Sequence, residues 1–450
     1  MQPRVDRAKA VLGKCDPWLL LALVGLTCVG VLMVYSASIA SAYRNYGSPY
    51  YVIEREIVWV AIGLVSLTAV TRLHYHTWRR VAFPFFAVCV AMLLAVLAPH
   101  FGHSSHGARR WFSLPAGVTV EPSELVKLAS VVYMAAWLTS KGDRVRDFKK
   151  VFFPFGIIVG VVAILIIKQP DLGTTIVVST SLFCVYFIAG ADLLPMAGAG
   201  VVAVGFAWVF AHNSSYRYDR LTAFMNPWQD PTGKGYHTVQ ALLALGTGGL
   251  FGQGFGNSLQ KNVLPAPHTD SILAVIGEEW GLMGTLGVLL LFLIVAYRGM
   301  RISVAAPDRF GKLLAGGITC WITFQALLNF AVITSSVPFT GVPLPFISYG
   351  GTSFIISMTA MGILLNISRH ASGEVFARQS THHGRRDGGT RLPRVISHPV
   401  PASTAGAGGG SHALQPRRAE RSRRLASSPS RGGTGRSNPV PQRPHNSGGP

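Results

Sequence analysis

Asp270 is the residue of this sequence that is best placed to do chemistry. It stands at the start of a long apolar segment, in the stretch LPAPHTDSILAVIGEEWG of residues 264–281, directly after His268 and Thr269. Ionisable groups beside a membrane-length apolar segment are costly, so they are candidates for function. This carboxylate is therefore the first candidate for a chemical role, with His268 as an orienting partner, a proton carrier or a surface imidazole. The alternative is that Thr269 or Asp270 caps the helix that follows, because both residue types are favoured at that position.

Two further pairs of charged residues lie against apolar segments. Glu124 and Lys127 in EPSELVKL are three residues apart, so they share one helix face, and Ser123 is expected to be the helix N-cap. They predict either a structural ion pair or a pair that faces a substrate. Lys168 and Asp171 in KQPDLGTT are also three apart, but the proline between them breaks regular helix. Such a break is tolerated where it lines protein or a wet cavity, so this pair is either an ion pair at a kink or part of a site.

Other charges near the apolar segments have less specific roles. Glu278 and Glu279 are adjacent and cannot share one helix face, so at least one must point into the protein and find a donor. Four basic residues of the preceding loop are of the type that binds an anionic group such as a pyrophosphate, although each is more often a solvated charge: Arg217, Arg220, Lys234 and Lys261. No compact His, Asp and Glu cluster has the spacing of a transition-metal site. A Mg²⁺ ion shared with a substrate pyrophosphate would leave no sequence signature.

The composition is that of a helical protein embedded in a membrane. Of the 450 residues, 49% are hydrophobic and 13% are charged, against about 25% charged in soluble domains. The apolar residues form blocks about as long as a bilayer-spanning helix needs, roughly 17 to 25 residues. These blocks are continuous, unlike the alternating strands of an outer-membrane barrel. The five cysteines are scattered singly, which supports neither a disulfide framework nor a zinc site.

Ten apolar segments predict an all-α, polytopic integral membrane protein with about ten transmembrane helices. They cover residues 17–39, 56–71, 81–98, 123–139, 152–168, 174–190, 193–211, 271–297, 313–334 and 346–367. Lys and Arg cluster in alternate loops, which places both termini in the cytoplasm. The short outer loops then keep only Arg44, Arg55, Arg109 and Arg110. One large extracytoplasmic loop, residues 212–270, connects the seventh and eighth segments.

The long outer loop and the C-terminal tail differ from the membrane domain, which we place at residues 17–370 after a short cytoplasmic N-terminus of residues 1–16. The loop is rich in aromatics, which argues against disorder. Its glycine run, residues 246–256, predicts a flexible or re-entrant turn packed on the bundle rather than a nucleotide-binding loop. Residues 371–450, rich in Arg, Gly, Ser and Pro, predict a disordered cytoplasmic tail. We expect this basic tail to be attracted to anionic lipid rather than to nucleic acid.

Seven ordered stretches of the chain resemble the SEDS family, the shape, elongation, division and sporulation proteins. They are DPWLLLALVGLTCVGVLMVYSAS, GARRWFSL, EPSELVKL, KQPDLGTT, the loop from RLTAFMNPW to NSLQK, LPAPHTDSILAVIGEEWG and PLPFISYGGTS, and they lie within about residues 15–370. The resemblance implies a peptidoglycan glycosyltransferase of the bacterial plasma membrane that polymerises lipid II, with a class B penicillin-binding transpeptidase as partner. The first stretch and NSLQK lean toward the members that act in cell division, which implies other divisome proteins as partners and the septum as location.

The resemblance also assigns roles to particular residues. The family's essential acid falls on Asp270, and its cavity-lining ion pair falls on Glu124 and Lys127. Ser271 replaces the aromatic residue that usually follows the acid, and Ala266 occupies a position that is often acidic. Both departures leave the carboxylate in place. The other residues expected to contact the substrate are Lys168, Asp171, Arg217, Arg220 and His268.

The expected reaction is an inverting transfer. Asp270 would take the proton of the acceptor 4-hydroxyl as that oxygen attacks the anomeric carbon of the donor, an effect that typically contributes about 10²–10⁴-fold. The α-linked donor and β-linked product require no covalent intermediate, and undecaprenyl pyrophosphate is already a good leaving group. Its developing charge would be stabilised by a cation, for which the candidates are Arg217, Arg220, Lys127 and Lys168. The alternatives are a lipid II flippase or transporter, a non-catalytic scaffold that recruits a transpeptidase, and an elongation polymerase of the same family.

Overall fold

The computed structural model describes residues 15–98, 103–105, 108–114, 118–212 and 223–386. The chain divides into two units at Thr390, and all the described residues lie in the first. Two predicted substrate-binding residues, Arg217 and Arg220, and the tail from residue 387 lie outside the described residues. Their predicted roles therefore stay predictions.

The described part of the chain contains ten long helices, one for each predicted membrane segment. They are α1 (Pro17–Tyr46), α2 (Tyr51–Arg72), α3 (His76–Leu97), α4 (Pro122–Lys141), α5 (Phe153–Ile167), α6 (Leu172–Ile188), α7 (Leu193–His212), α10 (Ile272–Ala305), α11 (Arg309–Ile333) and α12 (Gly351–Arg386). Six stretches are long and apolar enough to cross a membrane: α1, α3, residues 148–167 with α5, α10, α11, and α12 as far as Ala371. The prediction of a polytopic helical membrane protein is confirmed.

Several helices are capped by residues that satisfy the free backbone groups at their ends. The Asp16 carboxylate accepts from the backbone N–H groups of Trp18 and Leu19, both at 3.1 Å, so it satisfies donors that the first turn of α1 leaves free. At the other end of α1, Gly47 adopts a φ of 72°, which glycine tolerates without steric cost. Asp308 caps α11 in the same way as Asp16 caps α1, through the Phe310 N–H at 3.2 Å.

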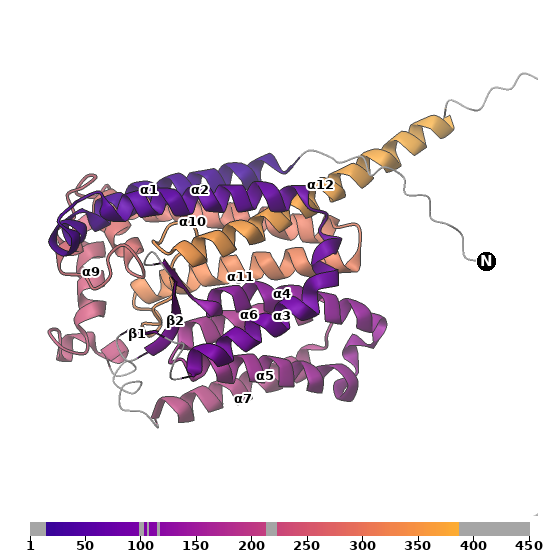
Figure 1. Cartoon of the computed structure of the whole chain (residues 1–450), viewed down its shortest axis with the longest axis horizontal. Coiled ribbons are helices and arrows are strands. Elements are labelled where there is room, and N and C mark those ends of the chain that lie inside the picture. Colours follow the sequence, from indigo (N-terminus) through magenta and orange to yellow (C-terminus); the bar gives the residue numbers. More distant parts are fainter. Residues whose placement is uncertain (1–14, 99–102, 106–107, 115–117, 213–222, 387–450) are drawn as a thin grey trace, which may run out of the picture. The chain divides into compact units, whose positions relative to one another are not determined.

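Among the six membrane-length segments, α11 and α12 are the most enclosed. Of their most apolar windows, 67% and 72% of residues are buried, against 22% in α3 and α10. The helix α12 lies along α2, and α10 lies along both α1 and α11, while α6 packs on α4 and α11 (Figure 1). Large apolar side chains are exposed on the outer helices, as lipid contact requires; examples are Leu21, Val65 and Ile164.

A small antiparallel sheet interrupts the helical pattern between α3 and α4. Its strands β1 (His103–Ser105), β2 (Ala108–Leu114) and β3 (Val118–Val120) are ordered β1-β2-β3. The all-α prediction missed this sheet because β1 and β3 have only three residues each, and the seven residues of β2, ARRWFSL, do not alternate between apolar and polar side chains. The sheet matters for function because β2 carries Arg110 into the site described below.

The long loop folds back on a break in α10. It contains a 13-residue helix, α9 (Tyr236–Gly248), and short turns at Pro227–Gln229 and Gln260–Asn262. Inside α10, Gly281 has a φ of 68° and a ψ of −164°, so the helix is interrupted there. The glycine-rich turn supplies the missing partners: Gln253 N–H donates to the Glu278 carbonyl and Leu282 N–H donates to the Gly249 carbonyl, both at 2.9 Å. The predicted turn packed on the bundle is confirmed.

The last helix is longer than predicted. We expected the tail to be disordered from residue 371, but α12 continues to Arg386, so the prediction is wrong for residues 371–386. This stretch contains Glu374, Ala377 and Gln379, which favour helix, and no proline follows until Pro393. An established helix extends through such a sequence because adding a residue costs much less than starting a new helix.

The break in α10 at Gly281 predicts that a larger residue at this position lowers the stability of the protein. A Cβ at Gly281 would lie 2.5 Å from the backbone nitrogen of Gly252, and the φ of 68° disfavours any other residue. We expect Gly281→Ala to lower the free energy of unfolding by at least about 1–3 kcal/mol, measured as a loss of thermal stability in detergent. The matched control is Gly287→Ala in the same helix, where a Cβ would meet nothing within 4 Å. An equal loss from both changes would contradict this account of the break.

Candidate functional site

A cavity of about 510 Å³ lies at the end of the bundle where α4, α6 and α12 begin. Polar side chains from five separate parts of the chain line it, and they include Arg55, Arg110, Glu121, Glu124, Asp171, Thr269 and Asp270. Three residues that the sequence predicted as site residues therefore meet in one cavity, namely Glu124, Asp171 and Asp270. This cavity is the candidate functional site.

The segment that carries Asp270 is held by its backbone. The carbonyls of residues 268–270 each accept one hydrogen bond from a different donor. These donors are Tyr349 N–H at 2.8 Å, Ser348 Oγ at 2.7 Å and Asn329 Nδ2 at 3.1 Å, in chain order. Asn329 lies on α11 and is 1% exposed, while Ser348 and Tyr349 immediately precede α12. The helix α11 and the segment that leads into α12 thus fix the backbone of Asp270.

The helix-cap alternative named Thr269 or Asp270, but the N-cap of α10 is Ser271, and the Ser271 side chain forms no cap hydrogen bond. The Asp270 side chain is half-buried and contributes to the cavity wall. One of its oxygens, Oδ2, would lie only 3.3 Å from a Cβ at Gly341, a residue whose φ is 69°. The backbone at Gly341 therefore approaches the carboxylate closely, which only a glycine permits.

Ser271 makes contacts that an aromatic residue could not make. It is fully buried, its Oγ donates to the Pro265 carbonyl at 3.0 Å, and it is hydrogen-bonded to His237 Nε2 at 2.9 Å. The His237 ring in turn packs against Phe339, with ring centroids 3.8 Å apart. The serine thus ties α9 to the start of α10. An aromatic ring is nevertheless present in this region, supplied by Phe339.

Glu124 and Lys127 form the predicted ion pair, and it is buried. Their side chains are 3% and 2% exposed, and Lys127 Nζ lies 2.8 Å from Glu124 Oε2. The ammonium also donates to Gln325 Oε1 at 2.9 Å and lies over the Trp321 ring. Glu124 faces the cavity while Lys127 stands behind it. The pair is therefore structural, and at the same time its Glu124 side presents a charged wall to the candidate site. The two predictions, a structural ion pair and a pair that faces a substrate, are compatible.

The partner of Asp171 is not the one that its spacing suggested. Lys168 is exposed and forms no ion pair with Asp171 among the described contacts, so the predicted Lys168–Asp171 pair is wrong. Asp171 instead caps α6 by accepting from Thr174 N–H at 3.0 Å, and it lies 3.7 Å from Arg110 NH1. Arg110 Nε also donates to the Gln169 carbonyl at 2.8 Å. The helix break at Pro170 turns Lys168 away and frees backbone carbonyls that Arg110 satisfies.

Three charged cavity residues were not predicted as site residues from the sequence: Arg55, Arg110 and Glu121. The two arginines were used only to orient the chain, although their presence in outer loops with few cations was a usable signal. Glu121, not Ser123, is the N-cap of α4, and it accepts from Ser123 Oγ at 2.8 Å. Burial, together with the charges of Glu124 and Asp171, raises the pKa of Glu121.

His268 supports the site from behind. Its carbonyl is one of the three that are held, and its ring packs edge-on against Tyr349 at 5.5 Å between centroids. Its Nδ1 is buried and has no hydrogen-bond partner in the described structure. Burial lowers the pKa of His268, so the neutral ring is favoured. This environment fits a positioning role better than a substrate contact.

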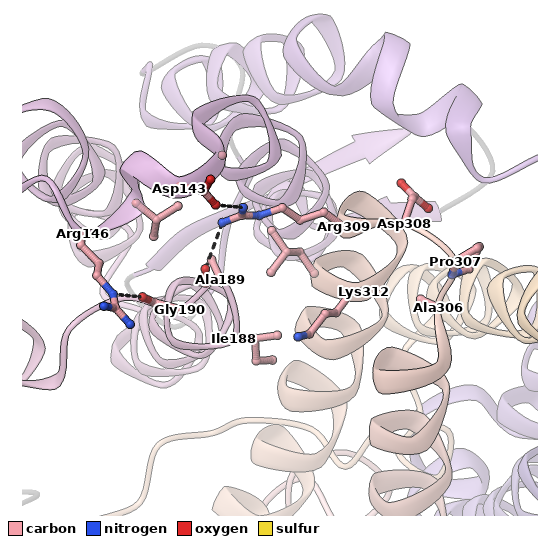
Figure 2. A pocket seen from close by; sticks show the side chains of 13 residues that line it. Asp143, Arg146, Ile188, Ala189, Gly190, Ala306, Pro307, Asp308, Arg309 and Lys312 are labelled. Carbon is pink, nitrogen blue, oxygen red and sulfur yellow. Dashed lines mark hydrogen bonds and ion pairs between the residues drawn. The ribbon is translucent and has the colours of Figure 1, made fainter. Parts of the chain in front are cut away.

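A second, larger cavity of about 700 Å³ lies at the opposite end of α4. Figure 2 shows that two of its cations are already engaged by protein groups. Arg309 pairs with Asp143 at 3.8 Å and donates to the Ala189 carbonyl at 3.1 Å, and Arg146 donates to the Gly190 carbonyl at 3.3 Å. No predicted catalytic or substrate-binding residue lines this cavity. Its size therefore does not make it the candidate site.

Within the part of the chain that the structure describes, no group of three or more His, Cys, Asp and Glu side chains is arranged to hold a metal ion. A cation that arrives with a substrate pyrophosphate stays a prediction.

These features define a class of protein: a multi-pass helical membrane protein with a charged cavity at one end of its bundle, lined in part by a long inter-helix loop. A family model described as cell cycle protein, for FtsW, RodA and SpoVE, matches residues 17–373. The chain belongs to this family, which is the SEDS family that its motifs resemble.

Known relatives match over nearly their whole length. A probable peptidoglycan glycosyltransferase FtsW of Trichlorobacter lovleyi is 42% identical over 358 residues, which are 79% of this chain and 94% of that protein. The stage V sporulation protein E of Bacillus subtilis is 37% identical over 361 residues, which are 80% of this chain and 98% of that protein.

Solved structures share the fold. A chain from a structure described as structural coordination of polymerization and crosslinking by a peptidoglycan synthase complex has a TM-score of 0.64 and 25% identity, and the match covers 79% of this chain and 98% of that one. The rod shape determining protein RodA of Thermus thermophilus has a TM-score of 0.58 and 24% identity, with 79% and 97% covered. The second match supports the fold alone.

The burial of His268 predicts a pH dependence of stability. Because its folded pKa is lowered, the unfolded chain binds the proton more readily, so stability is complete above the ordinary imidazole pKa of about 6.5 and falls below it. We expect the melting temperature of the wild type to fall more steeply than that of His268→Asn between about pH 6.5 and 5. The measurement is thermal unfolding of both proteins across this range. Parallel profiles would contradict the prediction.

Proposed function

We propose that the protein is a peptidoglycan glycosyltransferase that polymerises lipid II into glycan strands, with Asp270 as the general base. The observation that carries this proposal is a carboxylate on a rigidly held backbone, in a cavity that also presents Arg55 and Arg110. The relatives named FtsW support it, because they are described as probable peptidoglycan glycosyltransferases and match over most of the chain.

Asp270 acts on the acceptor sugar. Its carboxylate takes the proton of the acceptor 4-hydroxyl while that oxygen forms a bond to the anomeric carbon of the donor. The bond from this carbon to the pyrophosphate oxygen breaks at the same time, which inverts an α-linkage to a β-linkage without a covalent enzyme intermediate. A base is effective only within hydrogen-bond reach of the proton. The three hydrogen bonds to the carbonyls of residues 268–270 supply this precision.

Arg55 and Arg110 are the cations that we assign to the leaving pyrophosphate. Both line the same cavity as Asp270, and guanidinium groups suit phosphate oxygens because they present paired donors. Preorganised cations stabilise charge that develops in the transition state. Arg110 already interacts with Asp171 and with the Gln169 carbonyl, which holds its guanidinium in place. The sequence had offered four candidates for this role, namely Arg217, Arg220, Lys127 and Lys168. Of these, Lys168 is exposed and does not line the cavity.

The membrane setting is part of the proposal. Positive charge in alternate loops puts both termini in the cytoplasm and the cavity at the outer face, where the undecaprenyl chain stays in the bilayer and the sugars reach Asp270. We further propose a class B penicillin-binding transpeptidase and other divisome proteins as partners at the septum. The similarity to a chain of a peptidoglycan synthase complex supports the partner, and the FtsW relatives support division over elongation.

A lipid II flippase is the second candidate, and the broken helix α10 is the observation that favours it. Broken helices with polar groups are typical of transport pathways. Purified protein in vesicles that moves lipid II across the bilayer without forming polymer, even with its transpeptidase present, would establish this alternative. A scaffold role is tested by deleting residues 387–450, because lost localisation with intact synthesis would make that tail a recruitment arm.

The first prediction of this proposal concerns Asp270. We expect Asp270→Asn to lower lipid II polymerisation by about 10²–10⁴-fold, because an amide cannot accept the proton. The measurement is glycan formation by the purified protein with its transpeptidase partner. The matched control is Glu54→Gln, which removes an exposed acid near the same end of the bundle and should leave polymerisation unchanged. Polymerisation that survives Asp270→Asn would refute the base assignment.

The second prediction concerns the close approach of Gly341 to the acid. A methyl group at this position would crowd Asp270 Oδ2, at 3.3 Å, and would strain a φ of 69°. We expect Gly341→Ala to reduce the polymerisation rate by about 10-fold or more, because small displacements of a catalytic group are costly. Gly350→Ala is the control, since it lines the same cavity and its Cβ would meet only Ser353 Cβ, at 3.7 Å. Similar rates for the two variants would count against a tightly placed Asp270.

A further inference from the structure

Two adjacent acids of α10, Glu278 and Glu279, are buried but do not line the cavity. Each is 1% exposed, and both lie just before the helix break at Gly281. Buried carboxylates are retained only when donors or cations satisfy them. Both acids find their partners in the same short stretch of the long loop, residues 256–261.

Glu278 holds the backbone of this stretch. Its Oε1 accepts from Leu259 N–H at 3.0 Å, and its Oε2 accepts from Gln260 N–H at 3.2 Å and from the Ser258 hydroxyl. Ser258 Oγ in turn accepts from Lys261 N–H at 3.0 Å. The carboxylate therefore caps the short turn that begins at Gln260, in the way that an acid caps the start of a helix.

Glu279 connects the same stretch to α1. Its Oε1 lies 3.3 Å from Lys261 Nζ and accepts from Ser36 Oγ at 2.5 Å, and Ser36 is a fully buried residue of α1. Lys261 Nζ also donates to the Gly256 carbonyl at 2.6 Å. The Lys261 side chain is 10% exposed and that of Glu279 is not exposed at all. The pair is thus a buried ion pair with hydrogen bonds on both sides.

The position of this pair in the chain relates it to Asp270. Lys261 lies nine residues before Asp270 and Glu279 nine residues after it. The ion pair therefore connects the two ends of the segment that carries Asp270, residues 262–278. The downstream hydrogen bonds from α11 and the start of α12 hold the carbonyls of residues 268–270, but they do not hold residues 262–267. Within residues 262–267, Tyr236 Oη donates to the Val263 carbonyl at 2.9 Å and Ser271 Oγ donates to the Pro265 carbonyl at 3.0 Å. The Lys261–Glu279 pair anchors the upstream end of this stretch.

We infer that Lys261 and Glu279 form a clamp that positions Asp270 for the acceptor hydroxyl, so that Lys261 is a positioning residue rather than a pyrophosphate ligand. The sequence had placed Lys261 among the loop cations for an anionic substrate. The structure shows its ammonium engaged by Glu279, Gly256 and Ser36, away from the residues that line the cavity. The inference rests on the proposed function, because the acid that is positioned is the proposed base.

The clamp predicts a specific kinetic effect. Lys261→Met keeps most of the side-chain volume but removes the charge and the donors. We expect kcat for lipid II polymerisation to fall by about 10–100-fold, because a base displaced by roughly 1 Å loses reach, while KM changes by less than about twofold because the cavity cations remain. Lys261→Arg, which can renew the contact with Glu279, should recover most of kcat. A pyrophosphate ligand would instead show a raised KM.

A second measurement needs no activity. Hydrogen–deuterium exchange of the peptide covering residues 262–271 should rise in Lys261→Met relative to the wild type, while exchange in α11 stays unchanged. Arg44→Met is the matched control, because this exposed cation near the same end of the bundle bonds only to the Ala40 carbonyl of its own helix. Unchanged exchange in the 262–271 peptide would overturn the clamp. If the wild type does not polymerise lipid II at all, the proposed function fails while this exchange result still decides the clamp.

The double variant Lys261→Met/Glu279→Gln separates positioning from folding. The single change leaves Glu279 as a buried, unpaired charge, whereas the double variant removes both charges and should recover thermal stability. We expect its kcat to stay low despite this recovery. A double variant that is both stable and fully active would show that the ion pair only neutralises buried charge, and would overturn the inference.

Discussion

The hydrogen bonds that hold the carbonyls of residues 268–270 are the constraint on which the rest of this structure depends. A carboxylate at the end of a long loop is ordinarily mobile, because loops lie outside the packed core. Here Asn329 of α11 and the residues that precede α12 bind three successive peptide groups. Because these donors belong to the packed bundle, the hydrogen bonds also fix the position of Asp270, although it is a loop residue. The cavity, the close approach of Gly341 and the order of the loop all follow from that attachment.

A second theme is that this protein satisfies its buried charges by pairing elements that are distant in the sequence. Arg110 of β2 reaches Asp171 at the start of α6, and Lys261 of the loop reaches Glu279 of α10. In each case a break in helical structure lies beside the ion pair, at Pro170 and at Gly281. An interrupted helix frees backbone groups that the membrane cannot satisfy. Packing a charged loop against the break satisfies both the backbone and the acid.

Much of the architecture was predictable from the sequence because it follows from local physics. Long apolar blocks identify the helices, alternate basic loops predict their orientation, and the glycine run predicts a packed turn. Asp270 was identifiable because an acid beside a membrane-length segment is costly. The three strands were missed because two of them have only three residues and the third, β2, does not alternate between apolar and polar side chains. Residues 371–386 were assigned to the disordered tail because composition alone does not show that a preceding helix can continue into them.

The sequence by itself determined which segments enter the membrane and which acid is the candidate base, since burial cost and hydrophobic length are properties of single segments. Only the tertiary structure decided the partners of the charged side chains. Spacing suggested that Lys168 pairs with Asp171, and charge made Lys261 either a substrate contact or a solvated cation. In the structure Lys168 is exposed, Asp171 lies beside Arg110, and Glu279 engages Lys261. Only the tertiary structure shows that the site also contains Arg55, Arg110 and Glu121. The reason is physical: an ion pair depends on a distance of a few ångströms between side chains, and in this fold that distance is set by how remote helices pack.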